Sequence, residues 1–77
     1  MPTVHREGPF RFVIWPDDHR PPHVHCFRGN EEVVIFLESG EVRNVVGMQE
    51  RDVTRAIQIV HTQHQKLLAS WRQIHGF

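Results

Sequence analysis

The feature that most constrains the fold is a long stretch near the C-terminus that contains neither glycine nor proline. It runs from Gln49 to about His75, and its apolar residues recur at alternating steps of four and three. This spacing places them on one side of an α-helix and predicts a single long amphipathic helix. The predicted apolar stripe consists of Val53, Ile57, Val60, His64, Leu67, Trp71 and Ile74, widened by Ala56 and Leu68.

The residues at both ends of this stretch are typical of helix termini. Glu50 and Asp52 put negative charge in the first turn, where the helix dipole favours it, and Gly76 follows the last turn. We therefore expect a single domain, 1–77, with a β-rich part carrying a histidine-rich loop at 1–46 and a long helix at 47–77.

The length of the predicted helix bears on self-association. At about 1.5 Å per residue it would span about 40 Å, longer than the body of so small a domain. The apolar residues on the overhanging part must be buried against another surface. Their 3.5-residue spacing favours packing against the same helix of a second copy of the chain. We therefore expect a homodimer through the C-terminal helix. The alternative is a helix that breaks near Thr62 and Gln63 and folds back on the sheet.

The first part of the chain alternates short apolar runs with turn residues. Phe10, Phe12 and Ile14 share one face at period two, which predicts that this face belongs to the core. Gly29 and Asn30 suit a two-residue hairpin turn. The expected fold is α+β, a small antiparallel sheet of four to five strands packed on one long C-terminal helix. The strands are expected at 3–5, 10–15, 23–28, 32–37 and 41–44.

Charge and cysteine content limit the class of protein. Nine Lys and Arg residues balance nine Asp and Glu residues, so a strongly basic nucleic-acid footprint is absent and self-association is not opposed. Cys26 is the only cysteine, which suits a reducing cytoplasm, as does the lack of an apolar N-terminal signal segment. Its side chain should face away from His25 and behave as a small buried hydrophobe.

No apolar run approaches the roughly 20 residues that span a bilayer, so no membrane partner is expected.

The densest group of titratable residues is the stretch 17–25, Asp-Asp-His-Arg-Pro-Pro-His-Val-His. His23 and His25 are two apart on a predicted strand, so both imidazoles leave the same face, with Cα atoms about 7 Å apart. Two imidazoles at this spacing can converge on one metal ion. A nitrogen and oxygen ligand set fits zinc first, then manganese, iron or nickel, better than an iron–sulfur centre. The third ligand is expected among His19, Asp17, Asp18 and His64.

The same residues also allow chemistry without a metal. His23 and His25 can act as an acid–base pair on a ribose hydroxyl, while Arg20 or Arg28 stabilises the charge on phosphorus. They can equally bind a phosphate without turnover. A structural role is open too, because histidines near a proline-rich turn can hydrogen-bond loop carbonyls and hold the turn. For His64, inside the apolar stripe, a core or interface histidine is the favoured interpretation.

Several motifs of this sequence occur together in one known family. The most specific is Pro-Pro-His-Val-His at 21–25, preceded by Asp-His at 18–19. The opening Met-Pro-Thr-Val at 1–4, the aromatic strand at 10–15 and a long C-terminal helix with His64 and Trp71 add to it. On these residues the chain resembles the DUF4160 family of small bacterial and phage domains of unknown function, over nearly its whole length.

The resemblance implies a biological setting and assigns no catalytic residue. Members are often described as components of toxin–antitoxin modules encoded beside another small protein, so a cognate partner is expected. Arg20 stands where the family usually has an acidic residue, and Cys26 where it usually has valine, so the charge beside the site differs here. The leading expectation is a toxin–antitoxin-type protein that acts on RNA or nucleotides through the histidine cluster, with or without a metal. The alternatives are a non-catalytic antitoxin or adaptor, and a metal-binding protein without turnover.

Overall fold

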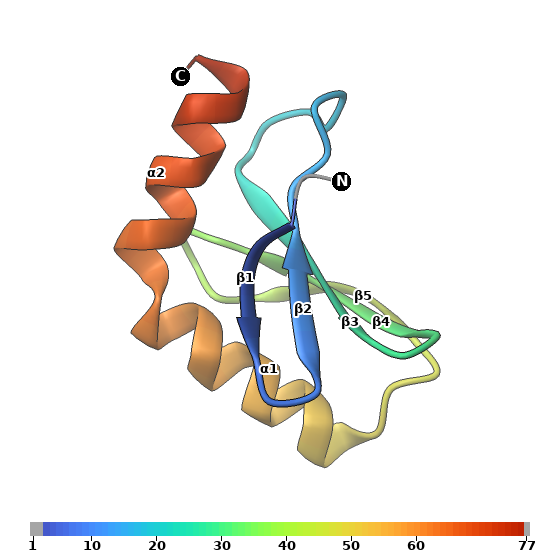
Figure 1. Ribbon diagram of the computed structural model, residues 1–77. Coiled ribbons are helices and arrows are strands. Elements are labelled where there is room, and N and C mark those ends of the chain that lie inside the picture. The colour runs from blue at the N-terminus through green and yellow to red at the C-terminus, as the bar shows by residue number, and fades with distance from the viewer. Residues whose placement is uncertain (1–2, 77) are drawn as a thin grey trace.

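The computed structural model describes residues 3–76, so Met1 and Pro2 of the opening motif lie outside the described part of the chain. The described residues form a five-stranded antiparallel sheet and two helices, which confirms the α+β class (Figure 1). Neither of these two helices is long and apolar enough to cross a membrane. The elements are β1 (Thr3–Glu7), β2 (Phe10–Val13), β3 (His23–Arg28), β4 (Glu31–Phe36), β5 (Val42–Val46), α1 (Glu50–Thr62) and α2 (His64–His75).

The sheet is a meander in which strands adjacent in sequence are also adjacent in space, in the order β1-β2-β3-β4-β5. Arg28 lies opposite Glu31, so Gly29 and Asn30 form the predicted two-residue turn. Gly29 has a φ of 61°, a backbone conformation that glycine adopts without steric cost. The central strand is β3, with β2 and β4 on either side of it.

The prediction of one long C-terminal helix is wrong, because the chain turns at Gln63. This residue has φ −100° and ψ 20°, outside the helical region, and α2 leaves it in a new direction (Figure 1). Thr62 donates its side-chain hydroxyl to the carbonyl of Gln58 at 2.9 Å, a type of bond that often bends helices. The alternative expectation, a break near Thr62 and Gln63, is the observed arrangement.

The break lets both halves of the apolar stripe cover one small sheet. The largest dimension of the domain is 33 Å, shorter than the roughly 40 Å of an unbroken helix. Leu67 and Trp71 of α2 have no exposed surface and belong to the same core as the sheet residues. The overhanging stripe that supported a homodimer through the C-terminal helix is therefore missing from the described structure.

The two faces of the sheet are used differently. One face packs against both helices and includes Val24 and Cys26 of β3. Cys26 has no exposed surface, as expected for a small buried hydrophobe. The neighbouring residues His23 and His25 leave the other face, because side chains alternate along a strand. The predicted core residues of the second strand are all confirmed in the helix-covered core, namely Phe10, Phe12 and Ile14.

A polar network joins β1 to the two helices. Lys66 donates to Nδ1 of His5 at 2.9 Å, and Nε2 of His5 donates to Glu7 at 3.0 Å. Glu7 also forms an ion pair with Arg55 of α1, at 3.3 Å. Both ring nitrogens of His5 are therefore satisfied by a neutral imidazole, with one accepting and the other donating.

Candidate metal centre

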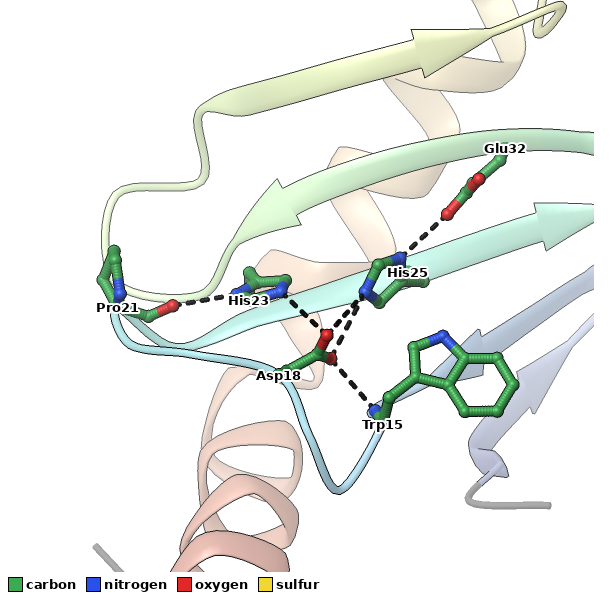
Figure 2. Close-up of polar contacts among 6 residues, drawn as sticks. All are labelled: Trp15, Asp18, Pro21, His23, His25 and Glu32. Carbon is green, nitrogen blue, oxygen red and sulfur yellow. Dashed lines mark hydrogen bonds and ion pairs between the residues drawn. The ribbon is translucent and has the colours of Figure 1, made fainter.

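The loop between β2 and β3 holds the carboxylate of Asp18 in a fixed position. The backbone amide of Trp15 donates to Asp18 Oδ2 at 3.0 Å, and the amide of Asp18 donates to the carbonyl of Trp15 at 3.1 Å. These reciprocal bonds close a tight turn directly after β2, where Pro16 cannot continue the sheet ladder. The turn directs the Asp18 side chain toward the first residues of β3 (Figure 2).

His23 and His25 are both oriented by a hydrogen bond at Nδ1. His23 Nδ1 donates to the carbonyl oxygen of Pro21 at 2.9 Å, and His25 Nδ1 donates to Glu32 Oε2 at 2.8 Å. Neither a carbonyl nor an ionised carboxylate can donate, so each Nδ1 carries the proton. In a neutral ring the Nε2 atom is then an acceptor with a free lone pair. This arrangement is the usual way in which proteins orient metal-ligating histidines.

The two Nε2 atoms converge on the Asp18 carboxylate (Figure 2). Nε2 of His23 lies 3.5 Å from Asp18 Oδ1, and Nε2 of His25 lies 3.3 Å from both carboxylate oxygens. The three residues each place one ligand atom within 4.8 Å of the others. With neutral rings the site would bring together acceptors only, which repel one another unless a proton or a metal cation lies among them.

The contacts of Asp18 with the two histidines are longer than strong hydrogen bonds. A charge-assisted N–H···O bond is typically about 2.7–2.9 Å long, shorter than the contacts of Asp18 with His23 and His25. Two ligand atoms each about 2.0–2.1 Å from one tetrahedral ion stand about 3.4 Å apart. The separations between Asp18 and the two histidines are therefore close to those between ligands of one metal ion, and all three ligand atoms lie within 4.8 Å of one another.

The cluster is shielded from water on most sides. The exposed fraction of the side chain is 3% for His23, 15% for His25 and 14% for Asp18. The ring of His23 packs against Trp71 of α2, with centroids 5.4 Å apart, and against Phe36 of β4 at 6.5 Å. This packing holds the imidazole at one angle, and low local polarity strengthens its electrostatic interactions.

The structure places the other candidates of this loop beside the cluster. His19, Arg20 and Asp17 line a hollow of about 330 Å³ that Asp18 and His23 also line. His19 is outside the three-residue group of ligand atoms found among residues 3–76.

His64 is also outside that group, although the sequence offers it as a third ligand. It begins α2 and lines cavities beside α1 and α2. Arg28, one of two arginines considered for stabilising a phosphate, lies at the far end of β3 and pairs with Glu31 and Asp52, each at 3.8 Å.

Two contributors to the site were missed from the sequence, Glu32 and Trp71 as a support for His23, whereas the bond from His23 to the Pro21 carbonyl is of the kind expected near a proline-rich turn. The predicted hairpin contained the signal for Glu32. With a turn at Gly29 and Asn30, Glu32 of β4 falls two residues from the partner of His25, on the same face. No comparable sequence signal points to Trp71 in this role, because its position depends on the break between the helices.

The thiol nearest the cluster is chemically separate from it. Cys26 follows His25 but points into the core, where burial raises the pKa of the thiol to about 12. A thiol in this state is neutral near pH 7, and a metal ligand would have to be the thiolate. The donor set at the cluster is therefore nitrogen and oxygen only.

The histidine motif lies within a recognised family domain. A model of a family described as a domain of unknown function, DUF4160, matches residues 10–72, most of the chain. The chain belongs to the DUF4160 family. The matched residues include strands β2 to β5, the histidine cluster, all of α1 and most of α2. No curated protein and no solved structure matches the chain significantly.

Proposed function

We propose that this DUF4160 domain binds one divalent transition metal ion through Asp18, His23 Nε2 and His25 Nε2, with zinc as the preferred ion. The observation that supports this most directly is that both histidines use Nδ1 as a donor to oxygen and direct Nε2 toward one carboxylate. Two histidines and one carboxylate form a common donor set of catalytic metal sites.

The proposed activity is cleavage of a phosphate ester in RNA or a nucleotide. Three protein ligands leave a coordination position open, and a metal ion bound there supplies Lewis acidity toward a phosphoryl oxygen. His23 and His25 would hold their orientation through Pro21 and Glu32, and Arg20 lies beside the cluster in the lining of the hollow. A role in a toxin–antitoxin module agrees with such an activity and stays a prediction.

A metal-free form of the same proposal uses the two histidines as acid and base. His25 lies between two carboxylates, Glu32 and Asp18, so a protonated His25 would be stabilised on both sides. His23 would then be the partner that accepts a proton. Measuring the metal content separates this form from the metal-dependent one.

A second candidate is a non-catalytic module that binds a cognate small protein or a second copy of the chain. The observation that favours it is the edge strand β5, where Val42, Val45 and Val46 are 38%, 42% and 52% exposed. An exposed apolar edge strand can add a strand from a partner. In this second candidate function, the surface that contacts the partner is β5 and not the C-terminal helix.

Elemental analysis of purified, untagged protein tests the metal proposal. We expect about one metal ion per chain in the native protein and none in the double variant His23→Ala/His25→Ala. His5→Ala is the matched control, because His5 is a strand histidine of similar burial whose two nitrogens are already satisfied. It should retain the metal.

A chelator should also lower the melting temperature of the native protein and leave that of the double variant unchanged, since removing a bound ion removes its stabilisation. Equal metal content in the native protein and the double variant would contradict the proposal. If neither binds metal, assays of RNA cleavage and of toxicity in cells decide between acid–base catalysis and partner binding.

A further inference from the structure

The hollow beside the cluster has walls of a defined chemical character. Its volume of about 330 Å³ lies near the lower end of small-molecule sites. Asp18 and His23 of the cluster form part of its lining, and Arg20 and Arg43 line the same hollow. Phe36 of β4 adds an aromatic surface. Any group that enters this hollow therefore meets the cluster and two cations together.

Arg43 reaches the hollow from the edge strand at an irregularity of the sheet. Val34 pairs with Asn44, whereas the next residue of β4, Ile35, pairs with Val42. Arg43 is thus the extra residue of a β-bulge. Bulges change the direction of a side chain and are frequent beside active sites.

The guanidinium of Arg43 has no ion pair or hydrogen bond with another side chain among residues 3–76. Two other arginines do have carboxylate partners, since Arg28 pairs with Glu31 and Asp52, and Arg55 pairs with Glu7. An arginine that lines a hollow without a carboxylate partner is available to an anionic ligand.

The balance of charge depends on the metal. Without a metal ion, the two carboxylates that line the hollow, Asp17 and Asp18, balance the two arginines, Arg20 and Arg43. A divalent ion at the cluster would make the charge around the hollow net positive and attractive to an anion. Metal and anion should therefore bind cooperatively, each raising the affinity of the other.

We propose that the hollow is an oxyanion site for a small phosphate ester, in which Arg43 is the specificity-determining residue and Arg20 assists it. The inference rests on the proposed metal centre and names the substrate class of that centre. A phosphoryl group offers several oxygens, so it can contact the metal ion and a guanidinium simultaneously. A carboxylate has two oxygens and a single charge, and should bind less well.

Calorimetric titration of the zinc-loaded protein with inorganic phosphate tests this site. Arg43→Gln should weaken phosphate binding by roughly tenfold or more, which is typical for loss of a charged hydrogen bond. Arg51→Gln is the control, since Arg51 is an exposed arginine of α1 that is not among the residues lining the hollow. It removes the same charge and should leave the affinity unchanged. Protein without metal should show no phosphate binding, and acetate should bind more weakly than phosphate.

The outcomes separate this site from the metal centre. Metal uptake with no phosphate binding, or equal affinities in the native protein and Arg43→Gln, overturns the oxyanion site and leaves the metal centre standing. Failure to bind metal removes the metal centre, and phosphate binding by the metal-free protein overturns the metal-dependent oxyanion site. If acetate binds more tightly than phosphate, the assignment to phosphate esters is wrong.

Discussion

The domain contains two arrangements of histidine with carboxylate, and they differ in what the ring nitrogens are free to do. At β1, His5 accepts from Lys66 at Nδ1 and donates to Glu7 at Nε2, so a neutral ring satisfies every partner. At the cluster, both histidines donate from Nδ1 and both Nε2 atoms face Asp18. Only in the second arrangement do two imidazole Nε2 atoms face the same carboxylate.

Burial does not separate these two arrangements. The exposed fraction of the side chain is 11% for His5 and 15% for His25, nearly the same value. Each histidine also lies near a carboxylate. The distinguishing observation is which nitrogen donates and to what, because that decides whether a lone pair is left for a metal. The first arrangement has the character of a structural tie and the second that of a ligand set.

The largest effect should come from the carboxylate at the centre of the cluster. Asp18→Asn replaces a charged ligand with a neutral one while keeping an oxygen that can accept from the Trp15 amide. We expect the affinity for zinc to fall by more than about 100-fold, measured by competition with a chromogenic chelator. Asp17→Asn is the matched control and should change affinity little, because Asp17 is outside the group of ligand atoms. Similar losses in both variants would mean that overall charge, and not ligation, governs binding.

An intermediate effect should follow from the residue that orients His25. Glu32→Gln keeps the shape of the side chain but removes the charge that fixes the Nδ1 proton, and should lower zinc affinity by roughly 10–100-fold. Glu7→Gln makes the same change next to His5 and should leave zinc affinity unaltered. The same chelator competition measures both variants. If Glu7→Gln has the larger effect, the contrast between the two arrangements is wrong.

The smallest effect should come from Cys26. Cys26→Ala should leave the metal content unchanged, because the thiol faces the core and is neutral. In the native protein the thiol should resist alkylation near pH 8 until the chain unfolds. Loss of metal from Cys26→Ala would place sulfur in the donor set and contradict the assignment.

The same thiol makes stability depend on alkaline pH. Its pKa is about 12 in the folded protein against an ordinary value of 9.0, so the unfolded chain releases a proton that the folded chain keeps. Any stabilisation from the buried neutral thiol is complete below pH 9 and is lost as the pH rises toward 12, by at most about 1.4 kcal/mol per pH unit. Urea unfolding at pH 8 and pH 10 should show a smaller decrease in Cys26→Ala than in the native protein.

Much of the sheet and half of the site follow from local patterns. Period-two alternation predicted that His23 and His25 share a face and that Cys26 is buried, and the β3 bounds agree with the expected strand. The pair Gly29 and Asn30 predicted the hairpin turn, which is confirmed. These features depend on residues that are close together in the chain, so they can be predicted from the sequence alone.

The break between the two helices was harder to predict from the sequence, because the residues around it are compatible with a helix. Nothing like glycine or proline marks Gln63, and the hydroxyl of Thr62 can either face solvent or bond back to Gln58. An unbroken helix of the predicted length would have exceeded the largest dimension of the domain, 33 Å. The consequence of the break is that Trp71 lies behind His23 and α2 does not extend beyond the domain.

By itself, the sequence determined that short strands precede a helical C-terminal part and that two imidazoles project together from the start of one strand, because these properties repeat with the period of the backbone. Only the tertiary structure decided that Asp18 joins them, that Glu32 orients one of them, and that Arg43 lines the adjoining hollow. Those contacts depend on the path of the loop before β3 and on a bulge in β5, where side chains from separate segments meet through packing and not through sequence spacing.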